Sequence, residues 1–116
     1  MDRRELGAIG ETLAASYLTT RGWRIVDRNV RFREGEIDIV AARGGVLAFV
    51  EVKTRRSSTF GSPAEAVTWR KQKRIRALAS RYLAERHPGA HAIRFDVVDI
   101  ARDGGGFLVT HLEDAF

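Results

Sequence analysis

The sequence lacks cysteine altogether, which excludes disulfide bonds and metal sites with thiolate ligands. It also lacks any apolar run that approaches the length of a membrane-spanning helix. The N-terminal segment MDRRELGAIGE carries charge but no apolar core, so we expect no secretory signal. These absences are compatible with a reducing compartment, and we predict a cytoplasmic protein that contacts no membrane.

Histidine patterns typical of metal sites are missing too. The 3 histidines, His87, His91 and His111, show no metal-ligand spacing, so we assign them no role. The chain has no internal repeat, linker or low-complexity segment. With 116 residues it can bury a sizeable core, and one domain over residues 1–116 is the expected organisation.

Positive charge is in excess. The chain has 20 Lys and Arg against 15 Asp and Glu, a formal net charge of +5. Such a balance favours a polyanionic partner, most often nucleic acid. Ribosome-associated and membrane-surface proteins are basic as well, so charge alone leaves these classes open.

The most informative stretch is a predicted β-hairpin. Two runs rich in β-forming residues, Glu36–Arg43 and Val46–Thr54, flank the pair Gly44-Gly45. Two glycines between such runs favour a tight turn, because glycine readily adopts the positive φ angles of that turn. The turn predicts these cross-strand pairs: Arg43 with Val46, Ile39 with Val50, Ile37 with Val52, and Asp38 with Glu51. The strand period of two predicts one wholly apolar face made of Ile37, Ile39, Ala41, Ala48, Val50 and Val52.

Acidic residues gather at the far end of this hairpin. The second face is apolar near the turn, which predicts a sheet covered on both sides, but it ends in Glu36, Asp38, Glu51 and Lys53. Facing carboxylates repel, so an acidic pair beside a buried surface requires a cation or a shared proton. We predict a divalent metal ion with Lys53 beside it. The alternative is a half-solvated strand end at which Glu36 pairs with Lys53 and nothing is bound.

Helical periodicity predicts a first helix over Arg4–Arg21. The residues expected to face the core recur at helical spacing: Leu6, Ile9, Leu13 and Tyr17. Glu11 lies outside the polar sector, among small residues that allow close approach to a sheet. Such a carboxylate points inward more often than a surface one. The helix dipole offers an alternative, because it favours acids in the first half of a helix.

The remaining elements follow from local signals. We expect strands over Trp23–Val30, Ala92–Ile100 and Phe107–Leu112. For Asp96 we expect a structural role, with a further acid near the site as the alternative. A loop is expected over Arg55–Gly61, followed by a capping box at Ser62–Glu65. A long helix over Trp69–Arg86 is expected next, with the core stripe Ile75, Leu78, Ala79, Tyr82 and Leu83.

The start of the long helix is strongly basic. Cations near a helix N-terminus oppose the macrodipole, which favours phosphate binding there; a solvated basic face is the alternative. Lys71 or Gln72 can point toward the sheet. Arg55 and Arg56 would stand close to anything bound at the strand end. The predicted nucleic-acid-binding residues are Arg55, Arg56, Arg70, Lys71, Gln72, Lys73 and Arg74.

The order of these residues resembles a known superfamily. A helical Glu11, then Asp38 at a strand end, then Glu51-x-Lys53 on the next strand resemble the PD-(D/E)xK nucleases. The segments Gly35–Asp38 and Phe49–Lys53 resemble more specifically the bacterial YraN-like family, over about Gly7 to Ile100. Archaeal Holliday junction resolvases are similar in fold, length and order of acids.

The resemblance implies a restriction-endonuclease-like fold, a three-layer α/β/α sandwich with a mixed central sheet of about five strands. It implies that Glu11, Asp38 and Glu51 bind Mg²⁺, with Mn²⁺ as a substitute, and that Lys53 helps activate water. Gln72 matches a supporting polar residue, whereas Ile37 replaces the proline of the superfamily motif. The implied function is a metal-dependent endonuclease acting on DNA, at branched or junction sites, as a homodimer. A nuclease fold that binds nucleic acid without cutting it remains the alternative.

Overall fold

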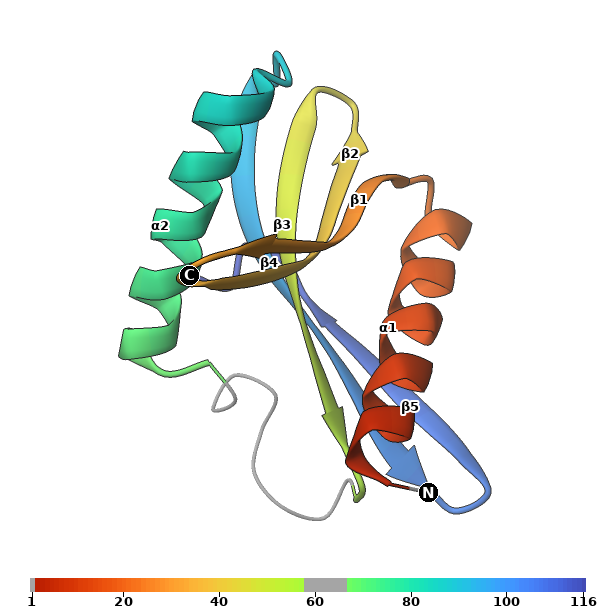
Figure 1. Cartoon of the computed structure of the whole chain (residues 1–116). Helices are drawn as coiled ribbons and strands as arrows, with labels where there is room; N and C mark the ends of the chain where they lie inside the picture. Colours follow the sequence, from red (N-terminus) through yellow and green to blue (C-terminus); the bar gives the residue numbers. More distant parts are fainter. Residues whose placement is uncertain (1, 58–66) are drawn as a thin grey trace.

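Two helices lie on opposite faces of a five-stranded sheet (Figure 1). The computed structural model describes residues 2–57 and 67–116. The helices are α1 (Arg3–Thr20) and α2 (Trp69–Arg86), and the strands are β1 (Arg24–Phe32), β2 (Gly35–Arg43), β3 (Val46–Arg55), β4 (Ala92–Asp103) and β5 (Gly106–Leu112). The strand order is β1-β2-β3-β4-β5. β3 and β4 pair in parallel and the other neighbours are antiparallel, so the predicted mixed sheet of five strands is confirmed.

Alternation along β3 builds both core layers. Ala48 and Val50 pack on the α1 side, whereas Leu47 and Phe49 pack on the α2 side. All four are buried, as expected for a strand covered on both faces. The three layers confirm the predicted α/β/α sandwich, which is consistent with a restriction-endonuclease-like fold.

The hairpin register is confirmed only near the turn. The predicted pairs extend from Arg43 with Val46 to Ile39 with Val50, and the ladder between β2 and β3 stops there. Beyond that point Asp38 Oδ2 accepts a hydrogen bond of 2.8 Å from the Val52 N–H. The predicted ladder pairs of Asp38 with Glu51 and of Ile37 with Val52 are therefore wrong, because a side chain replaces the backbone partner.

The predicted apolar face also breaks at Asp38. Ile37 packs into the cluster on the α2 side, whereas Ile39 packs into the cluster on the α1 side. The neighbouring strand changes at the same level: Asn29 has a φ of 53°, and it lies between the pairs Arg28–Ile39 and Val30–Ile37. A left-handed residue within a strand interrupts the alternation of side chains, so β1 is irregular at the level where β2 changes sides.

α1 meets the sheet through its small residues. Of the four predicted core residues only Leu6 is buried, and Ile9, Leu13 and Tyr17 are half-buried. The buried centre of the helix consists of Gly10, Ala14, Ala15 and Leu18. A Cβ atom on Gly10 would overlap the Thr54 side chain, lying only 3.0 Å from its Cβ and Cγ2 atoms. This close approach rotates the helix relative to the prediction and brings the neighbouring Glu11 to the sheet.

Replacing Gly10 with Ala is expected to lower the free energy of unfolding by about 1–3 kcal/mol, as overpacking does. Gly7→Ala is the matched control on the same helix, because nothing in the described structure lies within 4 Å of its Cβ position. That control is expected to stabilise the protein by about 0.5–1 kcal/mol, since alanine is the better helix former. Urea denaturation of both variants measures the difference; equal stabilities would contradict the close approach.

α2 begins and ends as predicted. The Thr68 side chain caps it by accepting a hydrogen bond of 3.2 Å from the Lys71 N–H, and His87 ends it in a left-handed conformation. The predicted capping box Ser62–Glu65, and most of the predicted loop before it, lie outside the described residues. β4 continues past the predicted end at Ile100, because β5 pairs with it as far as Asp103. No helix in the described ranges is long and apolar enough to cross a membrane.

Candidate metal centre and basic surface

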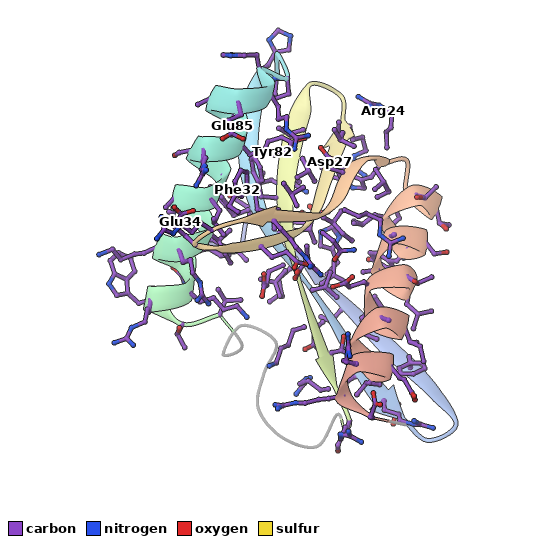
Figure 2. All side chains as sticks on the ribbon, viewed as in Figure 1. Arg24, Asp27, Phe32, Glu34, Tyr82 and Glu85 are labelled. Carbon is purple, nitrogen blue, oxygen red and sulfur yellow. The ribbon has the colours of Figure 1, made fainter. Side chains whose placement is uncertain are left out.

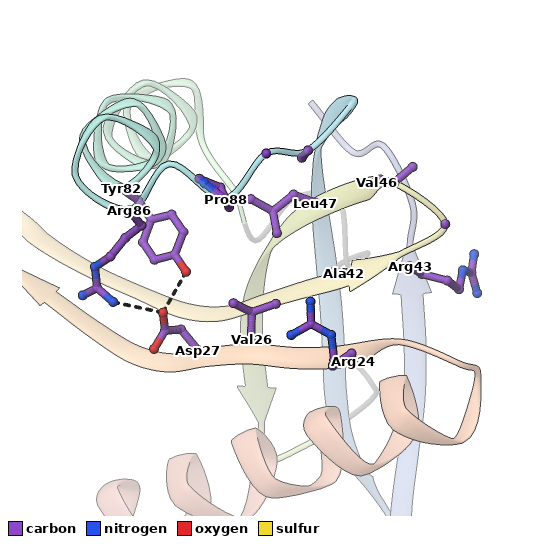
Figure 3. Close-up of a pocket in the computed structure, with 14 residues that line it drawn as sticks. Arg24, Val26, Asp27, Ala42, Arg43, Val46, Leu47, Tyr82, Arg86 and Pro88 are labelled. Carbon is purple, nitrogen blue, oxygen red and sulfur yellow. Dashed lines mark hydrogen bonds and ion pairs between the residues drawn. The ribbon is translucent and has the colours of Figure 1, made fainter.

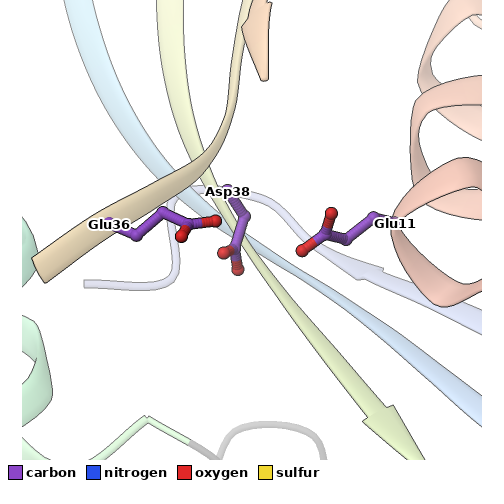
Figure 4. Close-up of side chains that lie close together, drawn as sticks. All are labelled: Glu11, Glu36 and Asp38. Atoms are coloured by element: carbon purple, nitrogen blue, oxygen red, sulfur yellow. The ribbon is translucent and has the colours of Figure 1, made fainter. Parts of the chain in front are cut away.

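Three carboxylates from two elements meet beside the sheet. Glu11 extends from α1, and Glu36 and Asp38 extend from β2 toward it (Figure 4). One oxygen from each lies within 4.8 Å of the others, and all three residues are partly exposed. The sequence prediction that Glu11 lies near Asp38 therefore agrees with the geometry, although the two are far apart in the chain.

Asp38 is the most perturbed of these acids. Burial, the neighbouring charges of Glu51 and Glu11, and a hydrogen bond with Glu51 raise the pKa of Asp38 from 3.8 to about 8, despite the opposing hydrogen bond from the Val52 N–H. Near neutral pH the metal-free side chain thus tends to keep its proton. A shared proton and a cation are the two physical ways to relieve such crowding of carboxylates.

Glu51 and Lys53 line the same cleft, which has a volume of about 510 Å³. Glu51 forms an ion pair with Lys71 of α2, with 2.6 Å between Oε1 and Nζ. Lys71 is thus the residue of the predicted pair that points toward the sheet. Within residues 2–57 and 67–116, Lys53 forms no hydrogen bond or ion pair. The cleft therefore contains an ammonium group that is not committed to a described protein partner.

The donor set suits a hard divalent cation. The converging atoms are carboxylate oxygens, which Mg²⁺ and Mn²⁺ prefer over nitrogen or sulfur. Glu11 and Asp38 belong to the predicted ligand set, whereas Glu51 stands next to Asp38 outside the group of three. Glu36, which was expected only as a charge at the hairpin end, takes the third place. Its observed ion pair is with Arg31, at 3.3 Å, and not with Lys53.

The predicted nucleic-acid-binding residues fall into two groups. Arg70, Lys73 and Arg74 are exposed on α2. Arg56 lines the cleft that contains Glu11, Asp38, Glu51 and Lys53, which we call the acidic cleft. Arg55 instead reaches the buried Asp99, with 2.9 Å between guanidinium and carboxylate atoms. Gln72 donates a hydrogen bond of 3.2 Å to the Val67 carbonyl. Nucleic-acid contact by the whole predicted set, from Arg55 to Arg74, stays a prediction.

Asp96 is a structural acid, as its sequence context suggested. Its carboxylate accepts hydrogen bonds from Arg94 at 2.8 and 2.9 Å and from the Asp114 N–H at 3.0 Å, and it contacts His111 Nε2 at 2.7 Å. Burial raises its pKa, but the hydrogen bonds from His111, Arg94 and the backbone outweigh burial and lower the pKa to about 2. His111 was assigned no role in the sequence, and here it completes this network.

A larger cavity, of about 600 Å³, lies away from the acids, between the end of α2 and the strands β1 to β3 (Figure 3). Its acid, Asp27, accepts hydrogen bonds from Tyr82 at 2.7 Å and from Arg86 at 3.2 Å, so α2 and β1 meet there (Figure 2). Burial and the contact with Asp27 raise the pKa of Tyr82 to about 12. These three side chains satisfy one another's hydrogen-bonding and charge requirements. The acidic cleft is therefore the candidate functional site.

Comparison with known proteins places this site in a family context. The model of the family described as "Uncharacterised protein family UPF0102" matches residues 10–100. A UPF0102 protein of Symbiobacterium thermophilum is 52% identical over 114 residues, covering 97% of both chains. One of Rhodococcus jostii is 56% identical over 96% of this chain and 95% of its own. One of Alkaliphilus oremlandii is 44% identical over 97% of this chain and 98% of its own. UPF0102 is the YraN family, so the predicted resemblance to YraN-like proteins is confirmed. The chain belongs to the UPF0102 family.

Proposed function

We propose that this protein is a metal-dependent endonuclease that hydrolyses DNA phosphodiester bonds. One observation carries the proposal: Glu11, Glu36 and Asp38 converge, and two of them, Glu11 and Asp38, line a cleft together with Glu51 and Lys53. The cleft borders the basic start of α2 through the contact between Glu51 and Lys71. Acids that can hold a metal ion, a lysine and adjacent cations together suit metal-dependent phosphodiester hydrolysis.

Each residue has a chemical role in this proposal. Glu11, Glu36 and Asp38 would hold Mg²⁺ or Mn²⁺. A bound divalent cation supplies charge stabilisation at the phosphate and lowers the pKa of a bound water. The Lys53 ammonium orients the attacking water and offsets negative charge on the phosphate oxygens. Lys71 holds Glu51 in place, which keeps this carboxylate beside Asp38.

Cleavage of a DNA panel tests the proposal. Linear duplex, single-stranded, flapped and four-way DNA are incubated with Mg²⁺ or Mn²⁺, and with EDTA as the control. We expect metal-dependent cleavage, with branched DNA as the favoured class because of the similarity to junction resolvases. Lys53→Met keeps the length of the side chain and removes the ammonium, so it is expected to abolish cleavage while DNA still binds. DNA that is bound but cut by no sample would favour the binding-only alternative.

The exposed cations of α2 are expected to bind the DNA backbone. Changing Arg70, Lys73 and Arg74 to Ala should weaken binding of all DNA sequences and flatten the log–log salt dependence by about 0.9 for each phosphate of duplex DNA that the variant no longer neutralises. Arg102→Ala is the matched control, because this exposed cation lies near the end of β4, where it pairs with Phe107 of β5 and not with α2. The test is the DNA dissociation constant measured between about 50 and 200 mM salt, because affinity that comes from phosphate contacts falls steeply over this range. An unchanged slope in the triple variant would place the binding surface elsewhere.

A further inference from the structure

Asn29 occupies an exceptional backbone position next to the three carboxylates. Its φ of 53° lies in the left-handed region, although the residue is within strand β1. By register it stands opposite Asp38, since Arg28 pairs with Ile39 and Val30 pairs with Ile37. Residues other than glycine avoid this region, and asparagine is among the few that tolerate it. The conformation directs the side chain to the acids.

One end of the Asn29 amide contacts two of the acids. It lies 2.8 and 3.2 Å from the two Glu11 carboxylate oxygens and 2.9 Å from Glu36 Oε1. In the metal-free protein this end is the nitrogen, because an amide oxygen there would face only acceptors. The amide thus bridges α1 and β2 and holds two carboxylates that would otherwise repel.

The same distances suit a second orientation of the amide. Around Mg²⁺, with metal–oxygen distances of about 2.0–2.1 Å in an octahedron, neighbouring ligand oxygens lie about 3 Å apart. Rotation about the last side-chain bond exchanges the amide nitrogen for its oxygen without moving the backbone. Amide oxygens are ordinary ligands of hard cations, so either end of this side chain has a partner.

We propose that Asn29 is a ligand of the divalent cation. It donates hydrogen bonds to Glu11 and Glu36 in the metal-free protein and turns its amide oxygen to the cation when one binds. This inference rests on the proposed metal site and adds a neutral fourth group to Glu11, Glu36 and Asp38. It assigns a binding role to a residue that carries no charge and shows no sequence motif.

Two substitutions at position 29 separate coordination from packing. Asn29→Gly removes the amide and accepts the left-handed backbone without strain, so the fold is kept. Asn29→Asp keeps the oxygen and replaces the donor with an acceptor. Asp114→Gly is the matched backbone control, because Asp114 is exposed, has a φ of 52° and lies outside the group of acids. Thr12 is exposed on α1 next to Glu11, so Thr12→Asp controls for the effect of an added negative charge near the site.

The measurements are the Mn²⁺ dissociation constant by calorimetry and the melting temperature with and without Mn²⁺. For Asn29→Gly we expect an affinity at least tenfold weaker than wild type, the lower end of the range for groups that support a metal. For Asn29→Asp we expect wild-type or tighter affinity at pH 8, together with a lower melting temperature in EDTA, because a further carboxylate then faces Glu11 and Glu36. Asp114→Gly and Thr12→Asp are expected to bind Mn²⁺ as the wild type does.

Three results would overturn the inference. Wild-type affinity in Asn29→Gly would remove Asn29 from the site while leaving the proposed metal site intact. Affinity as weak in Asn29→Asp as in Asn29→Gly would show that the amide only positions Glu11 and Glu36. A wild type without any Mn²⁺ response would overturn the proposed metal site and this inference with it.

Discussion

Replacing Asp38 with Asn is expected to abolish the metal-dependent rise in melting temperature and to leave the metal-free protein at least as stable as wild type at pH 8. In the metal-free protein Asp38 is crowded by Glu51 and Glu11, so neutralising it removes repulsion. With Mn²⁺ present the same change removes a charged ligand, and binding falls sharply. Thermal melts with EDTA and with Mn²⁺ measure both effects.

The pH dependence of stability checks the same residue without metal. The folded-state pKa of about 8 lies above the ordinary value of 3.8, so the folded protein binds the Asp38 proton more tightly than the unfolded chain does. The free energy of unfolding of the wild type should therefore fall as pH rises from about 4 to about 8. Asp38→Asn should lack this component. Urea denaturation at pH 5 and pH 8, both within the range from about 4 to about 8, measures this pH-dependent part of the free energy of unfolding.

Two further variants complete this experiment. Glu51→Gln is expected to lose cleavage and to weaken the metal response, because Glu51 stands beside Asp38 in the same cleft. Glu34→Gln is the control, since this exposed acid pairs with Arg81 outside the cleft. The metal-site interpretation fails if wild type shows no metal-dependent rise and both site variants melt far lower than wild type in EDTA.

Replacing Asp96 with Asn is expected to have the opposite effect on stability, lowering the free energy of unfolding by about 3–5 kcal/mol, as in other broken buried ion pairs. The carboxylate is fully buried, and its removal leaves Arg94 and His111 without their charged acceptor. Asp103→Asn, an exposed acid at the end of the same strand, is the control and should change stability little. Equal effects of the two substitutions would contradict a structural role for Asp96.

Acid titration gives the Asp96 network a second signature. Its folded-state pKa of about 2 lies below the ordinary value of 3.8, so its contribution is complete above that value and is lost as pH falls from about 4 to about 2. The slope of stability against pH thus has opposite signs for Asp96 and Asp38. Burial raises the pKa of both aspartates. Hydrogen bonds from His111 and Arg94 outweigh burial at Asp96, whereas the charges of Glu51 and Glu11 add to it at Asp38, and this difference separates a structural acid from a candidate ligand.

Local signals in the sequence determined most of the elements. The Gly44-Gly45 turn set the hairpin register near the turn, because a two-residue link permits few pairings. Helical periodicity predicted the range of α2, Trp69–Arg86, which the structure confirms. The order of Glu11, Asp38, Glu51 and Lys53 indicated a shared site, and the structure brings these residues to one cleft. Each of these predictions depends on residues that are neighbours in sequence or on a motif.

Only the tertiary structure decided which groups complete the site. Gly10 sets how closely α1 approaches β3, and that distance brings Glu11 to Glu36. The left-handed Asn29 has no local signature, because asparagine in a strand sequence does not reveal its φ. We predicted that Arg55 contacts nucleic acid, but its side chain contacts Asp99 on β4, at a sequence separation of 44. Such contacts follow from how elements pack across the sheet, and no short stretch of sequence encodes them.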